Sequence, residues 1–259
     1  RDRQVLHYQR ETFVRWWARR SAGRKLGTGK KAALFAGCLV NYQATDVGKA
    51  TVQVLEKNGV EVALPDQSCC GMPSFDIGDT AAMVAAAERT IASLKSWVDQ
   101  GYDVVIPTPS CSLMVKREYV SLVAGDEAKR VAEHTYDISE YLMKMKREGG
   151  LALDFTQKPG RVAYQVPCHL RDQNIGFKSK ELMECAGAKV EVIEKCSGHD
   201  GSWSAKVEFF PLSMKIAQKA VRMVEQAPAD LVASDCPLAG LQLDQAGAVA
   251  HAGGKSSQH

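Results

Sequence analysis

The strongest constraint on the fold is an internal repeat of cysteines. Three cysteines of the first half return in the second half at offsets of 130, 127 and 125 residues: Cys38 and Cys168, Cys69 and Cys196, Cys111 and Cys236. Each of them follows a short apolar run, and the order is the same in both halves. Near-equal offsets between chemically matched positions are typical of a duplicated unit. We therefore expect two pseudo-symmetric lobes.

Strand and helix patterns alternate in both halves of the chain. The first half predicts strands at 32–38, 60–64 and 103–106, with helices at 44–58 and 79–99. The second half predicts strands at 161–166, 189–193 and 230–234, with helices at 176–186 and 213–226. Such alternation favours parallel βαβ units with right-handed crossovers. The predicted fold class is α/β, with a small parallel sheet flanked by helices in each lobe.

The boundaries of the lobes follow from charge and from helix-capping signals. Asp137 and Glu140 have the spacing of a capping box, and Gly149-Gly150 ends the helix that they begin. The expected segments are a basic helix or arm at 1–30, a first lobe at 31–136, a helix and linker at 137–159, a second lobe at 160–245 and a disordered tail at 246–259.

The cysteines are the candidate ligands of a metal centre. Ligands bind beyond the carboxyl ends of strands in open parallel sheets, so cysteines that follow strands gather at one edge. Thiolates are the ligands that iron–sulfur clusters and zinc select. Eight cysteines in 259 residues are too few for a disulfide scaffold. Cys185 is unmatched, and we expect it to be an ordinary buried side chain. The candidate ligands are Cys38, Cys69, Cys70, Cys111, Cys168, Cys196 and Cys236.

These residues resemble the cysteine-rich CCG domain. Cys38, the triplet Cys69-Cys70-Gly71 and Cys111 are similar to the motif of that domain, which occurs in tandem in one subunit of heterodisulfide reductase and in one subunit of anaerobic glycerol-3-phosphate dehydrogenase. The stretches 166–171 and 196–203 resemble the glycerol-3-phosphate dehydrogenase type most. The resemblance covers about 31–245. It implies a four-iron cluster (4Fe-4S), cubane or non-cubane.

Both copies of the motif depart from the family pattern. Thr108 stands where the first copy would have another cysteine, and Ser197 and Ala239 replace cysteines in the second copy. Four thiolates suffice for a four-iron cluster, whereas three leave a position for another group. His199 would complete a set that suits iron or zinc, or would form an acid/base pair with Asp200. A plain hydrogen bond between these two side chains is the competing interpretation.

The distribution of charge, and the lack of recognisable binding motifs, limit the kinds of partner that this chain is expected to bind. Residues 1–31 carry ten Lys or Arg and two acids, so this arm suits an acidic partner or surface, including peripheral contact with the inner face of the membrane. Packing of its aromatic side chains onto the body is the simpler interpretation. No nucleotide-binding, nucleic-acid-binding or membrane-spanning sequence is recognisable. We expect a cytoplasmic location.

The resemblance implies an iron–sulfur electron-transfer subunit of an oxidoreductase. It would relay electrons from a flavoprotein or ferredoxin-domain partner to a quinone or a disulfide. The alternatives are a non-redox zinc-binding docking module and a thiol–disulfide reductase that acts at the second cysteine set. Related proteins carry an upstream ferredoxin-like domain. This chain lacks one and starts with Arg1 instead of methionine, which favours a fragment or a separate subunit.

Overall fold

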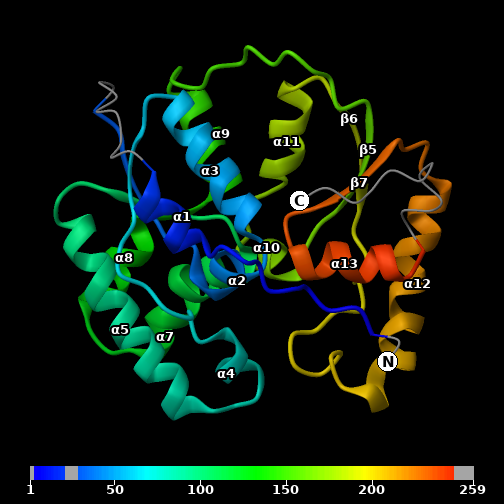
Figure 1. Cartoon of the computed structure of the whole chain (residues 1–259), viewed down its shortest axis with the longest axis horizontal. Coiled ribbons are helices and arrows are strands. Elements are labelled where there is room, and N and C mark those ends of the chain that lie inside the picture. Colours follow the sequence, from blue (N-terminus) through cyan, green and yellow to red (C-terminus); the bar gives the residue numbers. More distant parts are fainter. Residues whose placement is uncertain (1–2, 21–28, 248–259) are drawn as a thin grey trace. The chain divides into compact units, whose positions relative to one another are not determined.

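The chain folds into two compact units, each built on one parallel sheet (Figure 1). The computed structural model describes residues 3–20 and 29–247. Residues 7–152 form the first unit, and residues 153–247 with residues 3–6 form the second. The predicted α/β class with two sheet-containing lobes is confirmed. Residues 248–259 of the predicted tail lie outside the described residues.

The sheet of the first unit has four strands in the order β2-β1-β3-β4. Its strands are β1 (Lys31–Leu34), β2 (Glu61–Ala63), β3 (Asp103–Ile106) and β4 (Thr135–Asp137). All three neighbouring pairs are parallel. The predicted strands correspond to β1, β2 and β3. Strand β4 was not expected, because Thr135, Tyr136 and Asp137 form no apolar run, whereas β2 lies within the mostly apolar stretch 60–64.

Helices connect these strands and cover both faces of the sheet. They are α1 (Phe13–Arg19), α2 (Gly37–Tyr42), α3 (Thr45–Lys57), α4 (Met72–Asp76), α5 (Thr80–Val98), α6 (Pro109–Leu113), the π-helix η1 (Met114–Glu118), α7 (Tyr119–Leu122), α8 (Asp126–Glu133) and α9 (Ile138–Arg147). The two long helices predicted here are α3 and α5. Helix α9 begins with the expected capping box, in which the Asp137 carboxylate accepts from the backbone of Ser139 at 3.0 Å.

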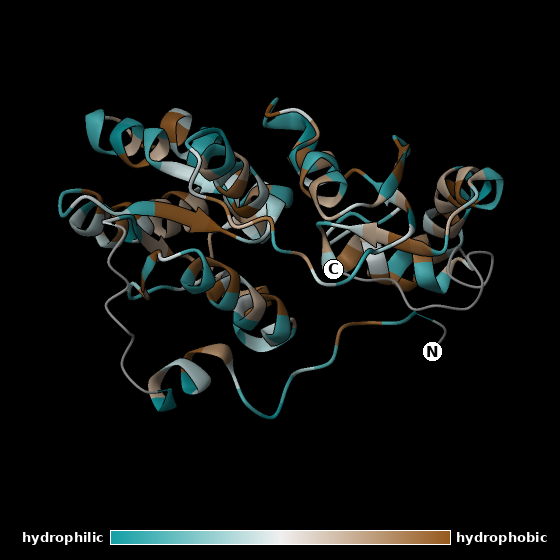
Figure 2. Cartoon of the chain, turned by 90° about the horizontal axis from the view of Figure 1, so that it is seen from above, coloured by the Kyte–Doolittle hydropathy of each residue, from teal (hydrophilic) through white to brown (hydrophobic). Residues whose placement is uncertain are grey.

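Alternate strand residues point to opposite faces and divide the core of the first unit. Val104 and Ile106 of β3 pack with α5 and with Tyr119 on one face. Leu34 of β1 packs with Phe13 and with α3 on the other. The view from above shows the apolar strands between helices (Figure 2). Burial on both faces explains why these short strands are continuous apolar runs rather than alternating ones.

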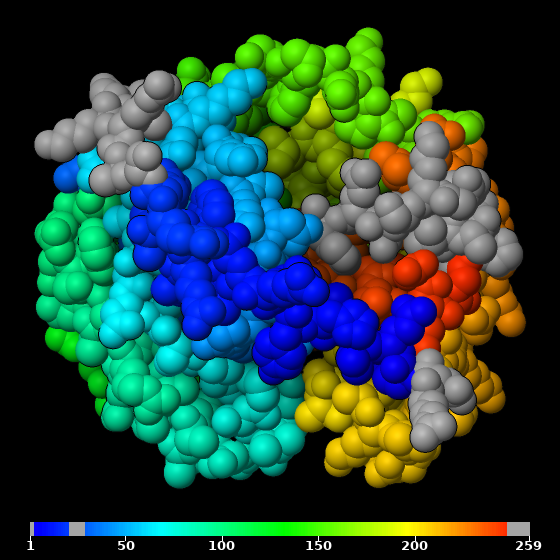
Figure 3. All heavy atoms as spheres, viewed as in Figure 1, coloured from blue at the N-terminus to red at the C-terminus, as the bar shows by residue number. Residues whose placement is uncertain are grey.

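Helix α1 packs its aromatic side chains onto the first unit. Phe13 is fully buried, and Trp16 and Trp17 are packed against the same cluster. The Arg20 guanidinium lies 4.3 Å from the centre of the Trp17 ring, in a cation–π contact. Helix α1 contacts α2 and α3 and lies on the outside of the unit (Figure 3). The simpler interpretation of the aromatic residues is therefore confirmed for this helix.

The second unit has a three-stranded parallel sheet in the order β6-β5-β7. The strands are β5 (Arg161–Gln165), β6 (Lys189–Ile193) and β7 (Leu231–Ser234). The helices are α10 (Cys168–Asp172), α11 (Lys178–Cys185), the 3-10 helix η2 (Val207–Phe209), α12 (Phe210–Gln226) and α13 (Pro237–Gln245). All three predicted strands and both predicted helices are present.

Helices also cover both faces of the second sheet. Ala163 and Val232 pack against α12 and α13, whereas Val162 and Tyr164 pack on the face that carries α11. Cys185, expected to be buried, is only half-buried, because α11 buries little of its own surface. Across the described ranges, no helix has both the length and the apolar character needed to cross a bilayer.

Candidate metal centres

The first cysteine set lies at the carboxyl edge of the four-stranded sheet. Cys38 is in the first turn of α2, shortly after β1, and Cys111 is in α6, shortly after β3. Cys69 and Cys70 lie in the loop that follows β2. Because β2, β1 and β3 are neighbours, their carboxyl ends bring these four residues to one place. The Cys38 and Cys69 sulfur atoms are 3.7 Å apart.

Hydrogen bonds between sulfur atoms link all four members of the first set. The thiol of Cys38 donates to Cys69, and this bond, with a second one from Cys70, lowers the pKa of Cys69 far below its usual range. A bond from Cys70 likewise lowers the pKa of Cys111. The pKa of Cys70 is raised for the same reason and by burial. The pKa values of Cys38 and Cys70 are thus raised, whereas those of Cys69 and Cys111 are lowered.

The surroundings of this set leave little room for other side chains. Gly71 has φ of +85°, and a Cβ atom there would lie 3.1 Å from the Cβ of Ala86. A Cβ atom on Gly37 (φ +63°) would lie 3.1 Å from the Cys111 sulfur. The Tyr119 hydroxyl donates to the Cys70 carbonyl at 2.7 Å. Cys70 and Cys111 are buried, so water has limited access to half of the set.

The second cysteine set lies at the equivalent edge of the other sheet. Cys168 begins α10 after β5, Cys196 lies in the loop after β6, and Cys236 is the N-cap of α13 after β7. Cys168 donates to Cys196 and lowers its pKa to about 6. Cys168 and Cys196 are exposed and Cys236 is half-buried. This set is more open to solvent than the first.

The Ser197-Gly198 turn corresponds to Cys70-Gly71 of the first unit. Gly198 has φ of +79°, and a Cβ atom there would lie only 2.3 Å from the Ser213 carbonyl oxygen. Ser197 is buried, as Cys70 is. The backbone of Gly198 donates to the Cys196 sulfur at 3.3 Å. The second turn thus keeps the shape of the first with a hydroxyl in place of one thiol.

His199 and Asp200 follow this turn. Burial and the nearby Arg3 guanidinium lower the pKa of His199 to about 4, although Asp200 opposes the shift. The imidazole is therefore neutral at neutral pH, a state that can bind a metal or accept a proton. The Asp200 side chain is exposed, and its backbone carbonyl accepts a bond from the Ser204 hydroxyl at 2.6 Å.

The donor chemistry of the first set fits a four-iron cluster. Four thiolates are the ligand complement of such a cluster, and each of them binds a different iron. The Thr108 hydroxyl is buried and has no hydrogen-bond partner among the described residues, and its position near Cys111 helps to lower the pKa of that thiol. In the part of the chain that the structure describes, no three His, Cys, Asp or Glu side chains converge to hold a single metal ion.

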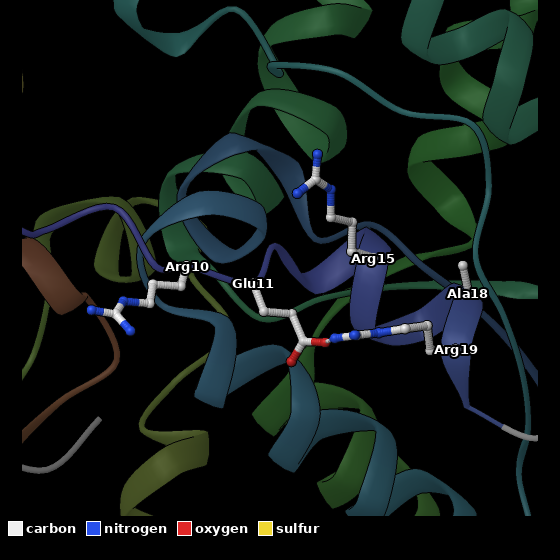
Figure 4. Close-up of a pocket in the computed structure, with 5 residues that line it drawn as sticks. All are labelled: Arg10, Glu11, Arg15, Ala18 and Arg19. Atoms are coloured by element: carbon white, nitrogen blue, oxygen red, sulfur yellow. Dashed lines mark ion pairs between the residues drawn. The ribbon is translucent and has the colours of Figure 1, made fainter.

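A shallow basic pocket lies on the first unit. It has a volume of about 340 Å³ and is lined by Arg10, Glu11, Arg15, Ala18 and Arg19. Glu11 forms ion pairs with Arg19 and, at 3.3 Å, with Lys49. The Arg10 and Arg15 side chains extend away from this carboxylate (Figure 4). The pocket therefore presents a net positive charge.

Comparison with known proteins links both sheets to one domain type. Residues 32–116 and residues 162–244 each match the family model described as CCG, a cysteine-rich domain. The matched stretches contain both cysteine sets. The two matches agree with the internal repeat and with the two sheets.

Several characterised proteins are similar along most of the chain. Lactate utilization protein A of Geobacillus thermodenitrificans is 32% identical over 219 residues, which cover 80% of this chain and 87% of that protein. The protein of the same name from Geobacillus kaustophilus is 32% identical over 236 residues, with 86% and 93% covered. A subunit of the anaerobic glycerol-3-phosphate dehydrogenase of Escherichia coli K12 is 28% identical over 246 residues, with 93% and 61% covered.

Proposed function

Because the chain belongs to the family of cysteine-rich CCG domain proteins, with two copies of the domain, we propose that it is an iron–sulfur electron-transfer subunit of an oxidoreductase. The observation that supports this most is the row of four linked sulfur atoms in the first unit. One similar protein is named as a subunit of a glycerol-3-phosphate dehydrogenase. The electron donor would be a flavoprotein or a ferredoxin-domain subunit, and the acceptor a quinone or a disulfide.

Cys38, Cys69, Cys70 and Cys111 would hold the 4Fe-4S cluster, cubane or non-cubane, which when bound supplies a one-electron redox centre. The protein keeps two of these sulfur atoms buried and two half-buried. Burial limits access of water and oxygen, whereas the half-buried side leaves a short route for an electron. The Tyr119 hydroxyl holds the backbone of Cys70 in place.

The second set is proposed to be the site where a substrate or partner reacts. Cys168, Cys196 and Cys236 supply three thiolates, and an incomplete set leaves a position that another group can occupy, as in catalytic metal sites. His199 is the proposed fourth ligand or proton acceptor, with Asp200 beside it. Zinc at this site would instead make the unit a docking module.

A thiol–disulfide reductase is the second candidate function. The exposed pair Cys168 and Cys196 favours it, because the pKa of Cys196 is lowered to about 6 by the hydrogen bond from Cys168. A thiolate at neutral pH with a second thiol beside it is the arrangement that disulfide exchange requires. This function would need no metal at the second set.

The basic pocket around Arg10 and Arg15 is the proposed contact with the redox partner. Its positive charge would attract an acidic patch on that protein and speed their encounter. Attraction to the anionic inner face of the membrane is the other use of the same charge. Raising the salt concentration should weaken either contact.

A redox titration tests the proposed function. Protein purified without oxygen is reduced stepwise with dithionite and followed by visible absorption and electron paramagnetic resonance. The proposal expects bleaching of the visible absorption, a signal from a reduced cluster, and reoxidation by a quinone analogue. A protein without a visible chromophore that reduces disulfides at Cys196 would establish the second candidate instead.

A further inference from the structure

One buried glutamine contacts the segments that carry all three cysteines of the second set. Gln165 is the last residue of β5, and its side chain is 1% exposed. Its amide nitrogen donates to the carbonyl oxygens of Val166 at 2.8 Å and Lys195 at 3.1 Å. Its amide oxygen accepts from the Ser234 hydroxyl at 2.9 Å. Both amide hydrogens and one lone pair are therefore used.

Each of these partners lies within two residues of a cysteine. Val166 precedes Cys168 by two positions, and Lys195 directly precedes Cys196. Ser234 precedes Cys236 by two positions, and its hydroxyl also accepts from the Cys236 backbone at 3.4 Å. The amide sits at the end of the central strand, where β6 and β7 flank it on either side. Its hydrogen bonds connect the segments that carry Cys168, Cys196 and Cys236.

The amide fixes the positions of its partners and adds only modestly to stability. A buried amide has a desolvation cost, and its hydrogen bonds return that cost with only a modest surplus. An apolar side chain of similar size would fill this place but would remove these bonds from the carbonyl oxygens of Val166 and Lys195 and from the Ser234 hydroxyl. A glutamine, unlike a leucine, fixes the distance and direction from its own segment to the Lys195 carbonyl and to the Ser234 hydroxyl.

In the first unit a glutamine amide also links two cysteine-bearing segments, but it comes from a loop and not from the end of a strand. Gln67 lies in the loop before Cys69, and its amide oxygen accepts from the backbone of Ala36 at 2.6 Å and Gly37 at 3.0 Å. Its amide nitrogen donates to the Leu34 carbonyl at 3.1 Å. This side chain therefore joins the segment of Cys38 to that of Cys69. Two independent glutamines thus perform the same task.

We propose that Gln165 is the positioning residue of the second cysteine set, which it holds ready to receive a metal–sulfur group. The inference rests on the proposed function of that set as a ligand site. It also argues against a set that persists only as packed thiols, because such packing needs no hydrogen-bonded amide at its centre.

The test measures the positions of the thiols directly. Dibromobimane becomes strongly fluorescent when it bridges two nearby thiols, and peptide mass spectrometry then identifies the pair. The full chain without bound metal is treated with this reagent. Wild type should give a bridge between Cys168 and Cys196 and a second bridge between Cys38 and Cys69. The second bridge serves as the internal standard.

Two variants remove the donors of the amide. Gln165→Leu donates to neither Val166 nor Lys195, and the isosteric Gln165→Glu, with at most one hydrogen to donate, cannot serve both carbonyls. We expect the Cys168–Cys196 bridge to fall about tenfold relative to the Cys38–Cys69 bridge, since the loss of one such bond changes a local equilibrium by roughly that factor. Val221→Ala, a core substitution in α12, a helix that contains no cysteine, should leave the ratio unchanged.

The outcomes separate this inference from the proposed function. An unchanged ratio in a folded Gln165 variant, or an equal loss in Val221→Ala, overturns the positioning role, whatever metal the protein binds. A lowered ratio in both Gln165 variants establishes the role. If wild type also binds no iron, the positioning role stands and the iron–sulfur function fails. The Glu variant keeps the test decisive if the Leu variant does not fold.

Discussion

The sulfur atoms of Cys38 and Cys69 lie 3.7 Å apart although 31 residues separate them in sequence. A helix and a strand lie between the two positions, so only the parallel pairing of β1 and β2 brings them together. In the second unit, the parallel pairing of β5 and β6 brings Cys168 and Cys196 together in the same way. The duplicated sheet is therefore what creates two thiol-rich edges in one chain.

Removal of one ligand of the first set should abolish its cluster. We expect Cys38→Ser to lose the iron bound in the first unit, because a hydroxyl is a much weaker ligand for iron than a thiolate. Iron and acid-labile sulfide per chain are the quantities to measure. Cys185→Ser is the matched control, since Cys185 belongs to neither set, and it should keep the wild-type content. An equal loss in both variants would show that the effect is not ligation.

Cysteine substitutions in the two sets should affect different properties, namely the cluster spectrum for the first set and partner-linked turnover for the second. In Cys196→Ser we expect partner-linked turnover to disappear while the spectrum of the first cluster survives. In Cys69→Ser that spectrum should itself be lost. Anaerobic electron paramagnetic resonance and turnover with an artificial acceptor measure the two properties side by side. Full turnover and full metal content in Cys196→Ser would make the second set vestigial.

Gly198 should be intolerant of any side chain. In Gly198→Ala the new Cβ atom meets the Ser213 carbonyl oxygen at 2.3 Å, in addition to the backbone strain at φ of +79°. The strain alone costs about 1–2 kcal/mol. Gly176→Ala is the control, because it has φ of +76° in the same unit and its new Cβ atom would meet only the flexible end of the Lys178 side chain, at 3.9 Å. Urea unfolding should show a clearly larger loss for Gly198→Ala, and equal losses would contradict the predicted clash.

His199 should make the metal-free second unit less stable in acid. Its pKa in the folded protein is about 4, below the usual 6.5, because burial disfavours the charged ring. As the pH falls below about 6.5, the unfolded chain gains a proton that the folded unit does not take up until about pH 4. Stability therefore falls across this window, by about 2 kcal/mol between pH 7 and pH 5.

His199→Gln should remove this part of the pH dependence, since glutamine does not titrate. Hydrogen exchange of peptides from the second unit in increasing urea, at pH 7 and at pH 5, compares the two proteins. The variant should lose less stability than wild type at the lower pH. Equal losses would mean that His199 titrates near its usual value and is not buried as described.

The fold could be predicted largely because its repeat is visible in the sequence. The offsets between matched cysteines, and the apolar runs before them, indicated the parallel strands β1, β3, β5 and β7 and their order along the chain. Strand β4 could not be predicted, because its pairing with β3 depends on the neighbouring sheet and not on its own three residues. The π-helix after Cys111 has no sequence pattern of its own.

The ligand candidates could be predicted, but their supporting residues could not. A cysteine that follows an apolar strand is informative by its type alone, whereas Gln67, Gln165 and Tyr119 are ordinary residues whose partners lie far away in sequence. The one available signal was a glutamine that ends the apolar run of β5. The lowered pKa of His199 comes first from its burial and then from Arg3, which is 196 positions away, and no local sequence pattern shows either effect.

The composition of the metal centre is the most direct test of the central claim. Protein purified and kept without oxygen should be brown, with visible charge-transfer absorption and equal amounts of iron and acid-labile sulfide. The account predicts this result for wild type and a clear loss of both elements in Cys69→Ser. A colourless protein that carries stoichiometric zinc and no sulfide would contradict it.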